Sequence, residues 1–370
     1  MRQSSLSADK LANLLAMTQA FSIAGRPIGT AAPPYIIAEM SGNHNGDIDR
    51  AFALLRAAQE AGADAVKLQT YTADTITIDH DGPEFTIAGG LWAGRRLYEL
   101  YAQAHTPWSW HQPLFDYGRE IGITVFSAPF DRSALALLAG LQAPAYKIAS
   151  PEIVDLPLIR QVAAVGKPII ISTGMASWPE ISAAVETARE AGARDIAVLH
   201  CVSAYPTPVE EANLATIGEL ARRLDCVIGL SDHTPNTTVA TAAVALGAQI
   251  IEKHFCLARS DGGVDSDFSL EPAELKQLVH DCRSAAAALG AASFEPTAAE
   301  QDMLKLRRSL YVVQNVPAGA VLSLANIRSI RPGRGLPPVE LDRVLGCRAA
   351  RDLTFGEPLD WSMVEKDPSA

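Results

Sequence analysis

The stretch AFALLRAAQEAGADAVKLQT, residues 51–70, contains the unit from which the fold can be predicted. Its first part places Ala and Leu at helical spacing and ends at Gly62, where a left-handed helix cap forms most easily. Its last part, AVKLQT, alternates apolar and polar side chains as a strand does. The same order of helix, glycine and strand recurs further along the chain, with glycines before strand-like runs at Gly122, Gly166, Gly192 and Gly247.

Three more strand-like runs lie near Tyr35, Tyr146 and Val227, which makes eight between Pro33 and Gly290. Strands that alternate with helices at this spacing pair in parallel. Eight such units in about 260 residues predict a (β/α)8 TIM barrel of the α/β class rather than an open doubly wound sheet. The GxGxxG nucleotide fingerprint is absent after the first strand. An aromatic-rich insertion, residues 71–123, follows the second strand on the side where barrel enzymes build their active-site rim.

The C-terminal tail contains an internal repeat. VPAGAVLSLANI, residues 316–327, aligns with LTFGEPLDWSMV, residues 353–364, at a constant offset of 37. Two copies of a strand–turn unit predict a small pseudo-symmetric β domain, and about 60 residues form only a marginal core. We therefore expect an N-terminal extension, a barrel, a linker and a small β domain, over residues 1–20, 21–290, 291–306 and 307–370.

Composition and charge restrict the class of protein. A hydrophobic content of 48% and a charged content of 20% are typical of globular chains. No window approaches the roughly 18 apolar residues of a membrane span, and the first 16 residues make a poor secretory signal, so we expect a cytoplasmic protein with no membrane partner. The net charge of −11 argues against nucleic-acid binding, which needs a surplus of basic residues. The five cysteines contain no CxxC motif and are interpreted as buried reduced thiols.

Catalytic groups of a barrel lie at the carboxyl ends of its strands, and side chains two residues apart share a face. Asp232 and Lys253 have the parity of the helix side, so we interpret them as a structural ion pair or hydrogen-bonding groups. The polar residues with the opposite parity, or at the strand ends themselves, are Glu39, Lys67, Gln69, Lys147, Ser150, Ser231, His233, Glu252 and His254.

Two hypotheses follow from these residues. His233 and His254 are one barrel unit apart, and two neutral imidazoles suit Mn, Co, Fe or Zn, with water or substrate completing the shell. The alternative is a hydrogen-bonded pair without metal. Lysines inside a barrel are costly without an anion. Lys67 and Lys147 therefore indicate a phosphate and carboxylate site, whose alternative is a salt bridge to Glu152 or Glu39. The hydroxyls expected there are those of Ser127, Ser150, Ser172 and Thr173.

At these residues the chain resembles the sialic acid synthase family, which condenses phosphoenolpyruvate with an open-chain amino sugar. The resemblance begins at Phe21 and is carried by IIAEMSGNHNGD, GADAVKLQTY, YKIASPEI, IISTGMA, GLSDHT, IEKHF and RSIRPGRGLPP. The C-terminal stretch is similar to the family's antifreeze-like SAF domain, a β-clip fold. LWAGRRLYELYAQAHTPWSWH, FSAPFD and GGVDSDFSLEP most resemble the branch that forms pseudaminic acid from 2,4-diacetamido-2,4,6-trideoxy-L-altrose. The alternatives within the family are N-acetylneuraminic and legionaminic acid, formed from other amino hexoses.

The resemblance implies roles for individual residues. Phosphoenolpyruvate would be held by Lys67, Lys147, Ser150 and Ser172, and Ser231 is grouped with these substrate-binding residues. Ser127 or the backbone would replace a phosphate-binding threonine of the family, because this chain has Ala128 there. A divalent metal, Mn2+ with Co2+ or Mg2+ as alternatives, would be held by His233 and His254. The sugar would be faced by Glu39, Gln69, Tyr205 and Asp265.

Two further expectations concern the attacking water and the assembly. Glu152 and Glu39 are the candidates for positioning or deprotonating the water, and the sequence does not choose between them. Arg331 would enter the barrel of a second subunit, which implies a domain-swapped homodimer. A sugar-binding module without activity and a metal-dependent hydrolase are the alternatives from other classes. The joint presence of the lysines, histidines and Glu39 argues against the first, and the lack of an HxH motif after the first strand argues against the second.

Overall fold

The computed structural model describes residues 20–365. These residues form two compact units that divide between Gly290 and Ala291, and each is described by itself. The expected N-terminal extension lies, apart from Ala20, outside the described residues. Within them, no helix has the length and apolar character needed to cross a membrane.

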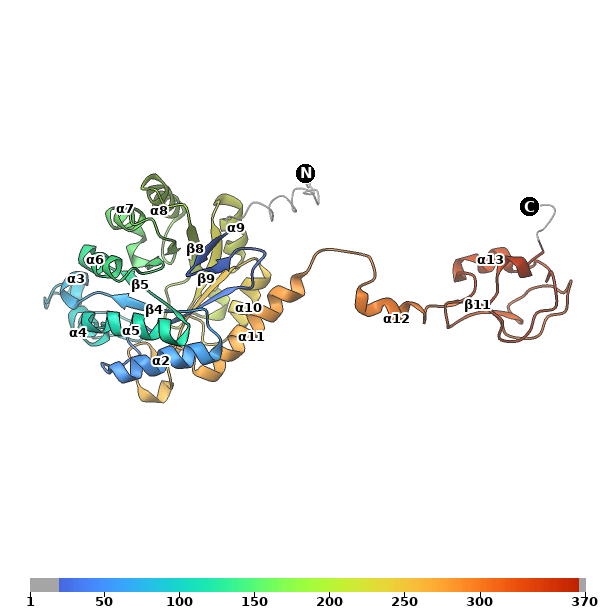
Figure 1. Ribbon diagram of the computed structural model, residues 1–370, viewed down its shortest axis with the longest axis horizontal. Helices are drawn as coiled ribbons and strands as arrows, with labels where there is room; N and C mark the ends of the chain where they lie inside the picture. The colour runs from blue at the N-terminus through green and yellow to red at the C-terminus, as the bar shows by residue number, and fades with distance from the viewer. Residues whose placement is uncertain (1–19, 366–370) are drawn as a thin grey trace. The chain divides into compact units, whose positions relative to one another are not determined.

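The first unit is a closed barrel of eight parallel strands, which confirms the predicted fold (Figure 1). The strands follow one another around the barrel in chain order, and the last pairs with the first. Every strand-like run of the sequence forms one of them. The strands are β3 (Tyr35–Glu39), β4 (Ala65–Thr70), β5 (Thr124–Pro129), β6 (Tyr146–Ile148), β7 (Ile169–Ser172), β8 (Ile196–Cys201), β9 (Val227–Asp232) and β10 (Ile250–His254).

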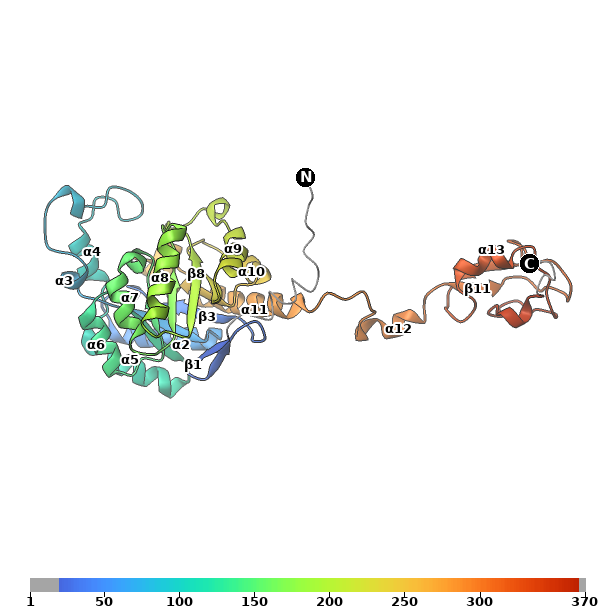
Figure 2. The ribbon, with the colours of Figure 1, turned by 90° about the horizontal axis from the view of Figure 1, so that it is seen from above.

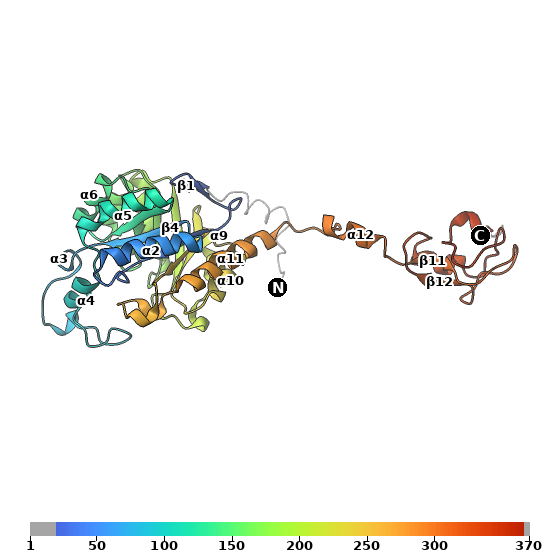
Figure 3. The ribbon, with the colours of Figure 1, turned by 60° about the horizontal axis from the view of Figure 1, so that its bottom comes forward.

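Helices follow the strands and cover the outside of the barrel. The stretch at residues 51–70 folds as predicted: α2 is capped by the Asp47 side chain and ends at Gly62, which has a φ of 88° in the left-handed region. Figure 3 shows α2 beside α11. The covering helices are α2 (Ile48–Ala61), α5 (Trp108–Ile121), α6 (Arg132–Gly140), α7 (Leu156–Ala163), α8 (Trp178–Glu190), α9 (Ala215–Arg223), α10 (Thr238–Ala245) and α11 (Pro272–Leu289).

The strands alternate between two apolar environments. Val66 and Leu68 of β4 belong to the core between strands and helices, so Lys67 and Gln69 face the barrel interior. The interior is apolar near the amino ends of the strands, and a hairpin of β1 (Phe21–Ile23) and β2 (Arg26–Ile28) contributes to the same cluster. Polar residues facing inward are thereby confined to the carboxyl end of the barrel.

One glycine of the barrel is required by close packing. A Cβ at Gly229 of β9 would lie 2.5 Å from the carbonyl oxygen of Ile250 and 2.6 Å from Cδ2 of Leu199. Any larger residue would push β9 away from its neighbours, two residues before the polar end of that strand.

The insertion between β4 and α5 contains α3 (Ala73–Ile76), η1 (Pro83–Phe85) and α4 (Leu97–Ala104). Figure 2 shows the segment between α3 and α4 looping out from the barrel. Part of it, residues 86–96, folds back on itself through an antiparallel bridge between Thr86 and Arg96, and we call it the arm. The other short helices of this unit are η2 (Pro151–Val154), η3 (Val209–Glu211), η4 (Arg259–Asp261) and η5 (Ser266–Phe268).

The second unit confirms the predicted pseudo-symmetric β domain. The amide of Leu322 donates to the carbonyl of Cys347, and the amide of Leu359 donates to the carbonyl of Leu310. Leu359 follows Leu322 by 37 residues, and Leu310 precedes Cys347 by 37, so the two bonds are equivalent in the repeat. Leu322 and Leu359 are both fully buried in one apolar cluster. The elements of this unit are η6 (Ala298–Glu300), α12 (Gln301–Leu304), β11 (Ser309–Val312), β12 (Ile327–Ile330), η7 (Pro338–Glu340), α13 (Leu341–Val344) and η8 (Trp361–Met363).

Candidate active site

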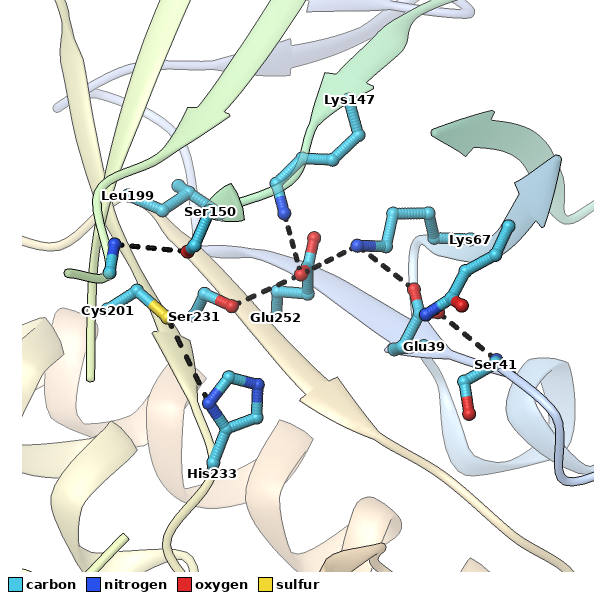
Figure 4. Close-up of polar contacts among 12 residues, drawn as sticks. Glu39, Ser41, Lys67, Lys147, Ser150, Leu199, Cys201, Ser231, His233 and Glu252 are labelled. Carbon is cyan, nitrogen blue, oxygen red and sulfur yellow. Dashed lines mark hydrogen bonds and ion pairs between the residues drawn. The ribbon is translucent and has the colours of Figure 1, made fainter. Parts of the chain in front are cut away.

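Four buried charged side chains meet inside the barrel at the carboxyl ends of its strands (Figure 4). Lys67 Nζ lies 2.8 Å from Glu252 Oε1 and 3.0 Å from Glu39 Oε2. Lys147 Nζ lies 2.9 Å from the same Glu252 oxygen. Ser231 Oγ donates to that oxygen as well, at 3.2 Å. Glu252 therefore joins both lysines, although the sequence assigned it no role beyond an inward-facing position beside His254.

Both lysines form salt bridges, but not entirely with the carboxylates expected from the sequence. Lys67 does pair with Glu39, but Lys147 pairs with Glu252 rather than with Glu152 or Glu39. Glu252 is 185 residues from Lys67 and 105 from Lys147, so the contact depends on closure of the barrel. Strand parity placed Lys67 and Glu252 on the interior face, and Lys147 was placed by its position at the end of a strand. The sequence contained no signal that Glu252 would pair with both lysines.

The ionisation of this cluster is set by burial and by the paired charges. Burial alone would raise the pKa of Glu252, but Lys147 and Lys67 together outweigh it and hold that pKa well below its usual range. Burial lowers the pKa of Lys147 to about 8 despite its contact with Glu252. For Lys67, burial is outweighed by Glu252 and Glu39, so its pKa is raised. Both lysines therefore carry a proton at neutral pH, and Glu252 is ionised between them.

The expected hydroxyl groups divide into two sets. Ser172 ends β7 on the interior face, and its buried Oγ has no hydrogen-bond partner among the residues that the structure describes. Ser150 Oγ accepts the amide N–H of Gly174 at 3.0 Å. Thr173 Oγ1 donates to the carbonyl of Leu199 at 3.2 Å. Ser172 thus has an unused hydroxyl directed into the interior, whereas Thr173 is committed to the backbone.

The expectation for Ser127 is wrong. Ser127 lies opposite Leu68 in the β4–β5 register, on the helix-facing side, while Phe126 is in the interior cluster. Its hydroxyl lies 2.6 Å from Thr70 Oγ1, which in turn lies 2.7 Å from His111 Nε2. The parity of β5 is the physical reason, because Phe126 and Ala128 take the inward positions. Applied to this strand, the alternation rule would have excluded Ser127.

The two strand-end histidines lie together as predicted. Their ring centroids are 5.3 Å apart. His233 Nδ1 lies 3.0 Å from the carbonyl oxygen of Val202, which can only accept, so Nδ1 carries the proton and Nε2 keeps a free lone pair. Within residues 20–365 the buried His254 Nδ1 has no hydrogen-bond partner, and burial lowers the pKa of His254 well below its usual range. Burial would lower the pKa of His233, but its contacts with Cys201 and the Val202 carbonyl outweigh burial and raise it. His254 is therefore a neutral ligand, whereas a cation at Nε2 of His233 would displace a proton.

The protein ligands available to a cation are few. Among residues 20–365 no group of three or more His, Cys, Asp or Glu side chains is arranged to hold a metal ion. A cation between His233 and His254 would take its other ligands from water or substrate, as the sequence hypothesis supposed. The uncommitted nitrogens of the two rings fit such a site.

The residues expected to face the sugar surround the histidines. Gln69 Nε2 donates to Glu39 Oε1 at 3.0 Å. Asp265 accepts from the Ser41 hydroxyl, and its Oδ2 lies 3.9 Å from His254 Nδ1. The Tyr205 ring centroid is 4.4 Å from that of His233. The structure thus brings these four residues to one end of the barrel.

The remaining candidates lie in different environments. Glu152, in η2, has a buried Oε2 that no described residue contacts by a hydrogen bond. Burial raises its pKa to about 7 although Lys147 opposes the shift. Asp232 and Lys253 form the predicted ion pair on the helix side, at 2.6 Å. Arg331 is exposed and lies in the second unit, just after β12.

Known proteins resemble the chain along most of its length. The NeuB family model matches residues 54–294, and the SAF domain model matches residues 307–365. A pseudaminic acid synthase of Campylobacter jejuni is 42% identical over 328 residues, which cover 88% of this chain and 95% of that protein. A pseudaminic acid synthase of Helicobacter pylori is 42% identical over 337 residues, covering 90% and 98%.

Solved structures also resemble the chain along most of its length. An N-acetylneuraminic acid synthetase of Leptospira borgpetersenii, in complex with citrate, superposes with a TM-score of 0.70 at 32% identity, covering 78% of this chain and 95% of that one. The spore coat polysaccharide biosynthesis protein SpsE of Bacillus subtilis gives a TM-score of 0.64 at 36% identity, covering 94% and 100%. The chain belongs to the NeuB family and carries a C-terminal SAF domain.

Proposed function

We propose that this chain is a pseudaminic acid synthase. It condenses phosphoenolpyruvate with 2,4-diacetamido-2,4,6-trideoxy-L-altrose and water to give pseudaminic acid and inorganic phosphate. The observation that carries the proposal is the buried Lys67–Glu252–Lys147 cluster beside two histidines with free ring nitrogens. The choice of sugar is supported by the Campylobacter and Helicobacter relatives, which are named for that product at 42% identity.

Phosphoenolpyruvate would bind at the lysine cluster. A trianionic substrate needs cations in a buried site, and Lys67 and Lys147 are both protonated at neutral pH. Three hydroxyls lie at the same end of the barrel, and that of Ser172 has no hydrogen-bond partner among residues 20–365. We assign Ser150, Ser172 and Ser231 to this substrate on those grounds.

A divalent cation is part of the proposal, with Mn2+ preferred and Co2+ or Mg2+ as alternatives. His233 and His254 would hold it through the ring nitrogens that make no hydrogen bond within the described part of the chain. When bound, the cation would act as a Lewis acid that polarises the sugar aldehyde.

The protein's own residues would place and move protons during the reaction. C3 of phosphoenolpyruvate forms a bond to the aldehyde carbon, water adds to the resulting cationic C2, and the C–O bond to phosphate then breaks. Water loses one proton as it adds, the alkoxide formed at the aldehyde carbon takes up one, and the hydroxyl left at C2 gives its proton to the departing phosphate as the ketone forms. Glu152 is our preferred acceptor, because its pKa of about 7 suits proton exchange near neutrality and its Oε2 has neither a hydrogen bond nor an ion pair among residues 20–365. Glu39 is the alternative: burial raises its pKa too, but the Ser41 amide and Gln69 occupy its Oε1, and Lys67 lies 3.0 Å from its Oε2.

We also propose a domain-swapped homodimer in which Arg331 contacts the sugar bound in the partner barrel. Its support is that Arg331 is an exposed cation on a separate compact unit of the chain. Arg331→Ala should raise the KM for the sugar far more than the KM for phosphoenolpyruvate. Equal changes in the two KM values would contradict this role.

A panel of sugars tests the function. The purified protein is incubated with phosphoenolpyruvate, Mn2+ and one aldehyde sugar per reaction, and phosphate release and product mass are measured. We expect efficient turnover with the L-altrose derivative. Higher kcat/KM with N-acetylmannosamine or with the precursor of legionaminic acid would replace the proposed sugar. A His233→Ala protein that stays fully active after chelation would contradict the cation site.

A further inference from the structure

The arm, residues 86–96, carries an aromatic side chain to the carboxyl end of the barrel. Trp92 Nε1 donates to the carbonyl of Val264 at 2.7 Å. Trp92 and Ile87 also pack against a small apolar cluster that includes Val264. Val264 directly precedes Asp265, whose carboxylate lies next to His254. The arm is therefore attached to the loop that forms one side of the candidate active site.

Two series of ring contacts connect Trp92 with the histidines. The Trp92 ring centroid lies 5.4 Å from that of Tyr205, which lies 4.4 Å from His233. It also lies 6.3 Å from Phe268, which lies 4.8 Å from His254. Trp92 itself remains partly exposed. It thus presents aromatic surface one ring farther from the histidines than Tyr205 and Phe268.

The chemistry of this surface is apolar. The indole has a single N–H, and Val264 already accepts it, so the ring has no donor left for a ligand hydroxyl. A hydroxyl placed against the ring would lose water without gaining a hydrogen bond, whereas a methyl group would gain contact area. With its aldehyde at the histidines, an open-chain sugar would extend its other end away from them, toward Trp92.

We infer that Trp92 is a specificity-determining residue that contacts the terminal methyl group of a 6-deoxy amino sugar. The inference rests on the proposed function and identifies the part of the sugar that the arm distinguishes. An apolar surface of this kind favours methyl over hydroxymethyl by about 10- to 100-fold in kcat/KM.

The test uses two sugars that differ at one atom. One is 2,4-diacetamido-2,4,6-trideoxy-L-altrose, and the other is its analogue with a hydroxyl on C6. For each, kcat/KM is measured with the native protein, Trp92→Ala and Trp92→Phe. Trp178→Ala is the matched control, because Trp178 lies on α8 and stacks against Arg223 at 4.6 Å. The KM for phosphoenolpyruvate is measured in parallel.

We expect the native protein and Trp178→Ala to prefer the 6-deoxy sugar by about 10- to 100-fold. Trp92→Ala should bring that preference close to unity and leave the KM for phosphoenolpyruvate unchanged. Trp92→Phe should retain most of the preference, because it keeps a ring and loses only the N–H.

Three results would overturn the inference while the proposed function stands, and a fourth would overturn both. Trp92→Ala could lower kcat/KM for both sugars by the same factor, or Trp92→Phe could behave like Trp92→Ala, which would assign the effect to the hydrogen bond with Val264. The native protein could also use the two sugars equally, in which case the proposed condensation stands and the role of Trp92 falls. Absence of turnover with both sugars would instead overturn the proposed function itself, and with it this inference.

Discussion

Replacing Glu252 with Gln removes one charge and keeps the shape of the side chain. In the native protein, both buried lysines contact the same Glu252 oxygen. Without that charge Lys67 keeps Glu39 at 3.0 Å. Among residues 20–365, Lys147 has no other carboxylate within ion-pair distance, and its side chain is only 2% exposed. The variant therefore leaves a buried ammonium without a partner.

The expected loss is large and depends on pH. Removing one member of a buried pair costs about 3–5 kcal/mol. The pKa of Lys147 is about 8 in the native protein and should fall further in the variant, because the attraction of Glu252 is gone. The unfolded chain protonates Lys147 at a higher pH than the folded chain does, so stability falls as pH falls. In the native protein this loss ends near pH 8, where Lys147 takes up its proton, whereas in the variant it continues to lower pH. The difference in unfolding free energy should therefore shrink by about 2–3 kcal/mol between pH 6 and pH 8 or above.

Urea unfolding at pH 6 and pH 9, followed by circular dichroism, measures both effects. Glu39→Gln is the matched control, because Lys67 then keeps Glu252 and the loss should be smaller. The double variant Glu252→Gln/Lys147→Met should recover part of the stability, because it removes the unpaired charge as well. A loss below about 1 kcal/mol at pH 6, or a loss equal at the two pH values, would refute the reasoning.

Three further predictions concern single side chains. Burial raises the pKa of Glu152 from 4.5 to about 7, so native stability falls as pH rises through that window. The unfolding free energy of Glu152→Gln should rise relative to that of the native protein by about 3 kcal/mol between pH 4.5 and 7. Urea titrations measure it, and a difference that does not change with pH would contradict the prediction. Lys253→Met leaves buried Asp232 without its cation, and should cost about 3–5 kcal/mol by the same assay, with partial recovery in the double variant with Asp232→Asn. Gly229→Ala should lower stability by about 1–3 kcal/mol, whereas Gly218→Ala on α9, where a Cβ meets open space, should not; equal effects would disprove the packing argument.

Local rules predicted the barrel because its repeating unit is local. Gly62 ends α2 in a left-handed conformation, and the alternation of AVKLQT then directs Lys67 inward. The same alternation paired His233 with Ser231 and put Asp232 on the opposite face, against Lys253. These outcomes follow from backbone geometry within one unit, which the sequence contains.

Rules of local backbone geometry could not predict contacts between distant strands. Glu252 meets Lys147 only because β10 and β6 face each other across a closed barrel. Ser127 was grouped with the phosphate hydroxyls for its chemistry. Its strand parity instead directs it to the helix side of the barrel, where it hydrogen-bonds with Thr70. The contact between Trp92 and Tyr205 joins an insertion to a loop after β8, and no periodicity encodes it.

The position of bond cleavage tests most directly the claim that the lysine cluster and histidines catalyse a condensation. Phosphoenolpyruvate carrying an oxygen isotope in the bridge between C2 and phosphorus is supplied with the L-altrose derivative. Cleavage of the C–O bond predicts that the label is recovered entirely in phosphate, with a nine-carbon 2-keto acid as the other product. Label retained in the sugar acid, or phosphate released without a new carbon–carbon bond, would contradict the account.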